Sequence, residues 1–165
     1  DVLIGCLDTI AGKDQLDKFC QRFLIPYIDI GMDVHKVGTG FLISGQVVLI
    51  TPGSPCLRCM GLVTEEALAQ EARNYGAAGG KPQVVWPNGL LASTAVGLFT
   101  QLICPWHGQT HASAFLEYDG NKGTLMPSKS FTFIADRACT HFHAEEAGDP
   151  LFDIRQEHLG VQGST

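Results

Sequence analysis

The apolar residues near the start of the chain first follow a strand pattern and then a helical one. Residues 1–8 read as a buried strand that is already under way, so we expect the chain to be the later part of a longer protein. A helix is predicted over residues 10–24, because apolar positions recur there at helical spacing. Pro26 ends this helix, since proline cannot continue the helical hydrogen bonds.

Two β-rich segments come next, with polar residues between them. Residues 27–30 are predicted as a short strand that Gly31 breaks, and residues 33–40 as a polar loop. Residues 41–50 are rich in strand-forming residues, and Gly45 is predicted to be a bulge or a hairpin point. The pattern therefore predicts two strands that are joined by a loop.

The middle of the chain carries two helical segments of different character. The segment 64–75 has two glutamates in its first turn, which favours the positive end of the helix dipole, and Gly76 ends it. Residues 76–82 are predicted as a flexible linker. Asn88 is predicted to cap a helix over 89–103 that carries no charge. Such a helix must be buried on nearly all sides or lie in a subunit interface.

The last third of the chain has the pattern of antiparallel strands. Residues 111–118 and 123–126 flank an Asp-Gly-Asn-Lys turn, which indicates a β-hairpin. Residues 131–134 are predicted as another short strand. Helices and strands alternate early and antiparallel strands dominate late. The expected class is therefore α/β with a mixed sheet.

Composition and charge narrow the classes of function. The 165 residues are 45 % hydrophobic and 17 % charged, which fits one folded domain rather than a disordered chain. The net charge is −6 and the cations are scattered singly, so we expect no nucleic-acid partner. The longest uncharged helix candidate is shorter than the roughly 20 residues that cross a bilayer, so we expect no membrane partner. No signal-peptide pattern is visible, and we expect a cytoplasmic protein.

Of the six cysteines, three are expected to be packing residues, and the others suggest a metal site. Cys56 and Cys59 form a Pro-Cys-x-x-Cys motif after a turn rich in Pro and Gly, which suits zinc or a redox pair. A third thiol is Cys139, and either His141 or His143 can supply a fourth ligand. The alternatives are a dithiol oxidoreductase and a solvated loop. The remaining residues, expected to pack as free thiols, are Cys6, Cys20 and Cys104.

Several motifs follow one another along the chain in a specific order: Cys6-Leu-Asp-Thr9, Ile25-Pro26, Gly45-Gln-Val47, Pro55-Cys-Leu-Arg-Cys59, Asn88-Gly-Leu-Leu-Ala-Ser93 and Tyr118-Asp-Gly120. Their order resembles the second half of the ThiF/MoeB/HesA fold, the ubiquitin-activating-enzyme-like adenylyltransferases. The resemblance covers residues 1–150 and leaves an acidic, Gly-rich tail over 151–165. It implies the C-terminal half of a Rossmann-like fold with a zinc knuckle. A homodimer is expected as well, because the charge-free helix over 89–103 suits a subunit interface.

The resemblance also implies a reaction and the residues that serve it. ATP and magnesium would adenylate the C-terminus of a ubiquitin-like or sulfur-carrier protein. Asp8 matches the family's strand-end aspartate, which supports adenylation and contacts Mg-ATP. The alternative without a catalytic role is that Asp8 only caps the following helix. Lys13 falls where relatives often have an arginine near the phosphates. The alternative without a binding role is a solvent-exposed cation on the helix surface. Phe142 stands where the second zinc pair would end, so either His141 or His143 replaces that cysteine, or the metal binds weakly or not at all.

The Gly-rich nucleotide loop of the family is missing, because it would lie before residue 1. We therefore expect this chain to be inactive by itself. The main alternative is a non-catalytic, zinc-stabilised module for dimerisation or partner binding.

Overall fold

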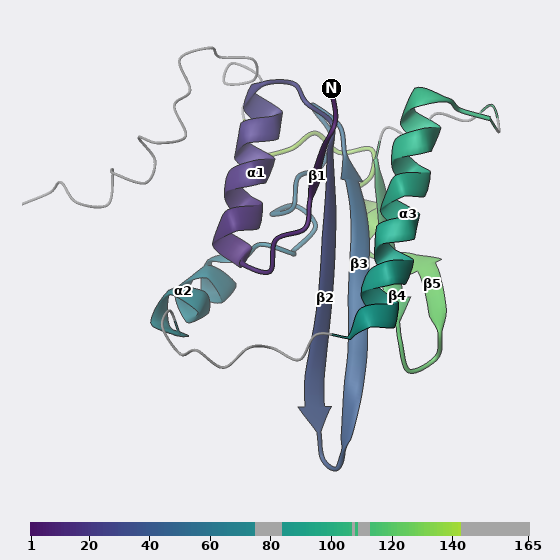
Figure 1. The fold of residues 1–165 in the computed structure, drawn as a ribbon. Coiled ribbons are helices and arrows are strands. Elements are labelled where there is room, and N and C mark those ends of the chain that lie inside the picture. Colours follow the sequence, from purple (N-terminus) through teal and green to yellow (C-terminus); the bar gives the residue numbers. More distant parts are fainter. Residues whose placement is uncertain (75–83, 107, 109–112, 143–165) are drawn as a thin grey trace, which may run out of the picture.

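The protein is a mixed β-sheet with helices on both of its faces (Figure 1). The computed structural model describes residues 1–74, 84–106, 108 and 113–142. In chain order the elements are β1 (Leu3–Gly5), α1 (Ile10–Arg22), β2 (Tyr27–Val37), β3 (Gly40–Ile50), α2 (Glu65–Asn74), α3 (Val85–Ile103), β4 (Ala114–Asp119), β5 (Thr124–Pro127) and the 3-10 turn η1 (Phe131–Phe133).

The sheet has five strands in the described residues, in the order β1-β2-β3-β4-β5. Strand β1 pairs in parallel with β2, and α1 makes the crossover between them. The other three pairs are antiparallel. Parallel neighbours need a long connection whereas antiparallel neighbours can share a short turn. The expected mixed sheet with late antiparallel strands is therefore confirmed.

The two faces of the sheet carry separate apolar clusters. Tyr27, Val48 and Ile50 face α1 and the loop after β3. Ile28 and Leu49 face the opposite way, toward α3. Because successive side chains of a strand point to opposite faces and both faces are covered, β3 is buried without a break from Val47 to Ile50. The helices α1 and α3 thus cover opposite faces of one sheet.

Strands β2 and β3 are longer than the sequence pattern predicted. Strand β2 continues through Gly31 to Val37, so the predicted strand end and the polar loop over 33–40 are wrong. The pairing stays in register through Gly31 and Gly45, so Gly45 is neither a bulge nor a hairpin point. A Cβ at Gly45 would lie 2.7 Å from Leu91 Cδ1 and 2.8 Å from the Gly31 carbonyl oxygen. Glycine serves close packing here rather than a turn.

Helix α3 begins four residues before the predicted start. Val84 holds its N-cap position, so the prediction that Asn88 is the cap is wrong. Pro87 lies in the first turn, where a helix tolerates proline because the backbone N–H has no partner there. One side of α3 is buried, but Trp86 and Val96 are 59 % and 56 % exposed. Burial on nearly all sides is therefore also wrong.

Of the remaining predictions for helices and strands, some are confirmed and others are wrong. Helices α1 and α2 and the β4–β5 hairpin are confirmed. The predicted first strand shrinks to Leu3–Gly5, and the predicted strand over 131–134 is the 3-10 turn η1. In the described part of the chain, no helix combines the length and the apolar character that a membrane span requires.

Candidate metal centre

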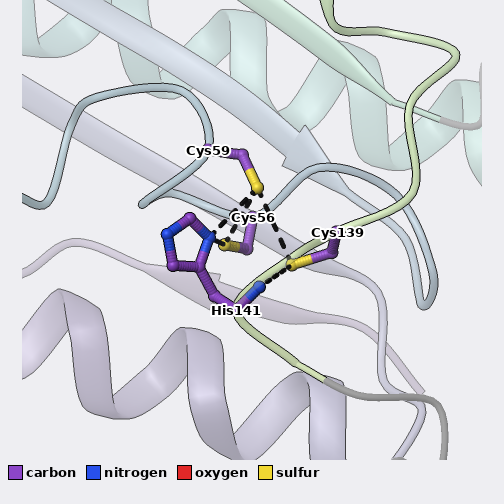
Figure 2. A group of neighbouring side chains, drawn as sticks. All are labelled: Cys56, Cys59, Cys139 and His141. Atoms are coloured by element: carbon purple, nitrogen blue, oxygen red, sulfur yellow. Dashed lines mark hydrogen bonds between the residues drawn. The ribbon is translucent and has the colours of Figure 1, made fainter.

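Four side chains that can ligate a metal ion point toward one another in one cluster (Figure 2). Cys56 and Cys59 come from the loop that follows β3, and Cys139 and His141 come from the segment that follows η1. One donor atom from each side chain lies within 4.8 Å of all the others. The fold therefore brings together two short segments that are about 80 positions apart in sequence.

The distances between the donor atoms fit a tetrahedral zinc ion. Zn–S bonds of about 2.3 Å and Zn–N bonds of about 2.0–2.1 Å imply S···S contacts of about 3.8 Å and S···N contacts of about 3.6 Å. The Cys59 sulfur lies 3.7 Å from the sulfurs of Cys56 and Cys139. His141 Nδ1 lies 3.5 Å from the Cys56 sulfur and 3.2 Å from the Cys59 sulfur. All three cysteines are free thiols, and their donor set is one that zinc prefers.

Two tight turns shape the loop that carries the first pair of ligands. Ser54 accepts a hydrogen bond from the Thr51 N–H at 3.0 Å and donates one to the Thr51 carbonyl at 2.7 Å. The N–H of Met60 then bonds the Cys56 carbonyl at 3.1 Å. Gly61 follows with φ +73°, a backbone conformation that favours glycine. These turns place both sulfurs on the same side of the loop.

Two carboxylates of α1 hold this loop against the helix. Asp17 accepts a hydrogen bond from the Leu57 N–H at 2.7 Å. Arg58 makes a two-pronged contact with Asp14, at 2.7 and 2.9 Å, and also reaches Glu65 at 2.6 Å. Burial acts to raise the pKa of Asp14, but the hydrogen bonds from Arg58 and the charge of Lys18 outweigh it and lower that pKa. The loop is thus anchored through the two residues that lie between its cysteines.

The electrostatics of the cluster favour one thiolate at Cys139. A hydrogen bond from the Cys56 thiol is the largest influence, and it lowers the pKa of Cys139 although burial opposes it. The same bond, together with burial, raises the pKa of Cys56. Burial raises the pKa of nearby Asp17 to about 7. Thiolate is the metal-binding form of cysteine, so Cys139 is prepared to act as a ligand.

The structure distinguishes among the other expected site residues. Between the two candidate histidines it places His141 at the cluster, while His143 lies outside the described residues. Cys20 is buried as expected, but Cys6 and Cys104 are exposed rather than packed. Their neighbouring apolar residues suggested burial, yet both cysteines lie just beyond the end of an element.

Asp8 lies in the exposed bend between β1 and α1. It does not cap the helix, because Thr9 holds the N-cap position and makes no side-chain capping bond. The two carboxylate oxygens of Glu71, on α2, instead accept the N–H groups of Ile10 and Ala11, both at 2.8 Å. The sequence carried no signal for this cap, since Glu71 is about 60 positions away.

Lys13 is buried and points into the sheet rather than into solvent. Its Nζ donates to Asp29 at 2.6 Å and to the Ile30 carbonyl at 2.7 Å. The Tyr27 hydroxyl donates to the same Asp29 carboxylate at 2.9 Å. The solvated-cation alternative is therefore wrong, and the ammonium group already has two partners.

Comparison with known proteins adds no relative to this picture. No protein-family model matches the chain, and no curated protein matches it significantly. The resemblance to the ThiF/MoeB/HesA family therefore depends on the order of the sequence motifs alone.

Proposed function

We propose that Cys56, Cys59, Cys139 and His141 bind a structural zinc ion. The observation that carries this proposal is the convergence of four donors from two distant segments at tetrahedral spacing. Four protein ligands leave no open position for a zinc-bound water, so the site suits stabilisation rather than metal catalysis. Zinc would tie the loop after β3 to the segment after η1.

Metal analysis of the purified chain tests this site. We expect stoichiometric zinc, and a cobalt-substituted protein with the visible absorption of a tetrahedral thiolate site. His141→Ala should weaken zinc binding strongly, whereas His143→Ala should not. Cys104→Ser is the matched control, because this exposed thiol lies outside the cluster. Zinc-free protein, or equal effects of His141→Ala and Cys104→Ser, contradicts the assignment.

We further propose that the chain is the zinc-bearing part of an ATP-dependent enzyme that adenylates the C-terminus of a ubiquitin-like or sulfur-carrier protein. Support comes from the order of the motifs and from the parallel β1–α1–β2 unit. The exposed Asp8 carboxylate follows β1, and ligands of open α/β sheets bind beyond the carboxyl ends of parallel strands. Magnesium prefers such oxygen ligands and would neutralise phosphate charge there.

Adenylation is tested on the full-length gene product by ATP–pyrophosphate exchange with ubiquitin-like partners. We expect exchange, and its loss in Asp8→Asn. Asp136→Asn, at an exposed aspartate after η1, is the matched control. The absence of both exchange and ATP binding would remove the enzyme proposal while leaving the zinc proposal intact.

The second candidate is a non-catalytic dimerisation module. It is favoured by the outer side of α3, where Val96 and Ile103 are 56 % and 64 % exposed on a helix without charged residues. This candidate predicts a dimer in light scattering that Val96→Glu converts to a monomer. A wild-type monomer contradicts it.

Tightly bound zinc would argue against the remaining alternative, a dithiol oxidoreductase.

A further inference from the structure

We propose that hydrogen peroxide, or another peroxide, replaces the zinc ion of this centre by a disulfide between Cys59 and Cys139. This inference rests on the zinc site proposed above. It assigns a specific oxidation product to the cluster and makes the site a sensor of peroxide.

The exposure of the three cysteines favours this pair over the two other pairs. The sulfur of Cys59 lies 3.7 Å from the sulfurs of both Cys56 and Cys139, so distance alone allows either as its partner (Figure 2). Cys56 is fully buried, whereas Cys59 and Cys139 are both partly exposed. A peroxide can reach Cys59 or Cys139 directly, and each has the other as its nearest accessible thiol. Oxidation at Cys56 would require a sulfur that solvent does not reach.

The chemistry of this exchange balances with peroxide as the two-electron oxidant. A zinc-bound thiolate, Cys59 or Cys139, attacks one peroxide oxygen; an S–O bond forms, the O–O bond breaks and hydroxide leaves. The resulting sulfenic acid is then attacked by the second thiolate. An S–S bond forms, the S–O bond breaks and a second hydroxide leaves. Two sulfurs are oxidised, and two peroxide oxygens are reduced.

Loss of two thiolates removes half of the ligands of the zinc ion. Cys56 and His141 alone do not complete the four-ligand set of a structural site, so the ion dissociates. The disulfide would preserve the link between the loop after β3 and the segment after η1. The loop itself stays anchored to α1, because the contacts of Asp14 and Asp17 involve no ligand side chain. Oxidation therefore exchanges one cross-link for another.

Trypsin separates the three cysteines, which makes the product easy to identify. Cleavage after Lys36, Arg58, Arg73, Arg137 and Arg155 places Cys56 in peptide 37–58, Cys59 in 59–73 and Cys139 in 138–155. The zinc-loaded full chain is treated with hydrogen peroxide while a chromogenic chelator reports released zinc. Digestion without reductant and mass spectrometry then identify the linked peptides.

We expect stoichiometric zinc release together with a link between peptides 59–73 and 138–155. Dithiothreitol should reverse the link and restore zinc binding. A variant with Cys6→Ser and Cys104→Ser should behave as wild type, because both exposed thiols lie outside the cluster. In Cys56→Ser the same link should form, which tests the pairing independently of the buried thiol.

Two results would overturn the proposal. One is a link between peptides 37–58 and 59–73. The other is retention of zinc at peroxide doses that already oxidise Cys6 and Cys104. A chain that holds no zinc before treatment refutes the metal site itself, and the exchange with it, so the two failures are distinguishable.

Discussion

Replacing Lys13 by methionine tests the buried charge pair between α1 and the sheet. Methionine keeps most of the length and the apolar stem of lysine but removes the ammonium group. Asp29 is 0 % exposed, and without Lys13 it keeps only the hydroxyl of Tyr27 as a side-chain partner among the described residues. The substitution therefore leaves a carboxylate in the core with no opposite charge.

The magnitude follows from the geometry of the pair. Opposite charges 2.6 Å apart attract by about 6 kcal/mol at an effective dielectric constant of about 20. Much of that attraction offsets the cost of removing both groups from water. Removal of one partner of a buried pair costs about 3–5 kcal/mol, a large fraction of the about 5–15 kcal/mol that stabilises a typical domain.

The effect of Lys13→Met should depend on pH. Burial raises the pKa of Asp29, and the charge and hydrogen bond of Lys13 oppose that rise, so the variant raises this pKa further. A carboxyl whose pKa is higher in the folded state binds more protons there, and the folded state loses stability as pH increases. The cost of Lys13→Met should therefore be larger at pH 8 than at pH 5.

Urea denaturation measures the free energy of unfolding of wild type, Lys13→Met, Asp29→Asn and the double variant. We expect the double variant to be more stable than Lys13→Met, because no unpaired charge remains in the core. A cost below about 1 kcal/mol for Lys13→Met, typical of an exposed pair, would refute the reasoning. So would a cost that is the same at pH 5 and pH 8.

Four further changes test other parts of the structure. Removal of zinc by a chelator should lower the free energy of unfolding by up to about 4.5 kcal/mol, measured in urea, which is the closure entropy of a loop of about 80 residues. Arg58→Lys should weaken zinc binding by about tenfold in a chelator competition, since it loses the two-pronged carboxylate contact. Glu71→Gln should cost about 1 kcal/mol and lower the Tm, because it weakens the cap of α1, whereas Glu66→Gln should not. Gly45→Ala should cost about 1–3 kcal/mol by thermal denaturation, because its Cβ would be crowded.

The glycines and prolines show where local sequence patterns misled. Gly31 and Gly45 were predicted to interrupt their strands. Both instead lie inside long paired strands, where a Cβ would collide with a neighbour. Asn88 was predicted as the cap of α3, but the helix begins at Val85, and Pro87 fits its first turn because that turn has no need of its N–H. Glycine can interrupt a strand or allow close packing, and proline can end a helix or fit its first turn. Only the neighbouring elements in the packed structure decide which of these applies.

The charged residues show a second limit of prediction from the sequence. The sequence placed Lys13 and Glu71 on helices but carried no information about what they would touch. Lys13 pairs with a strand residue 16 positions away, and Glu71 caps a helix about 60 positions away. These contacts depend on how α1 docks on the sheet and on α2.

By itself the sequence determined the helical periods of α1 and α2, the late hairpin and the types of metal ligand. Each of these is a local property, readable from spacing, turn residues or side-chain chemistry. Only the tertiary structure decided that Cys139 and His141 would meet Cys56 and Cys59, because two helices and two strands separate the two pairs in sequence and must pack before the pairs can meet. It also decided that Lys13 would be a core ion-pair partner, because burial is a property of the packed elements and not of the residue.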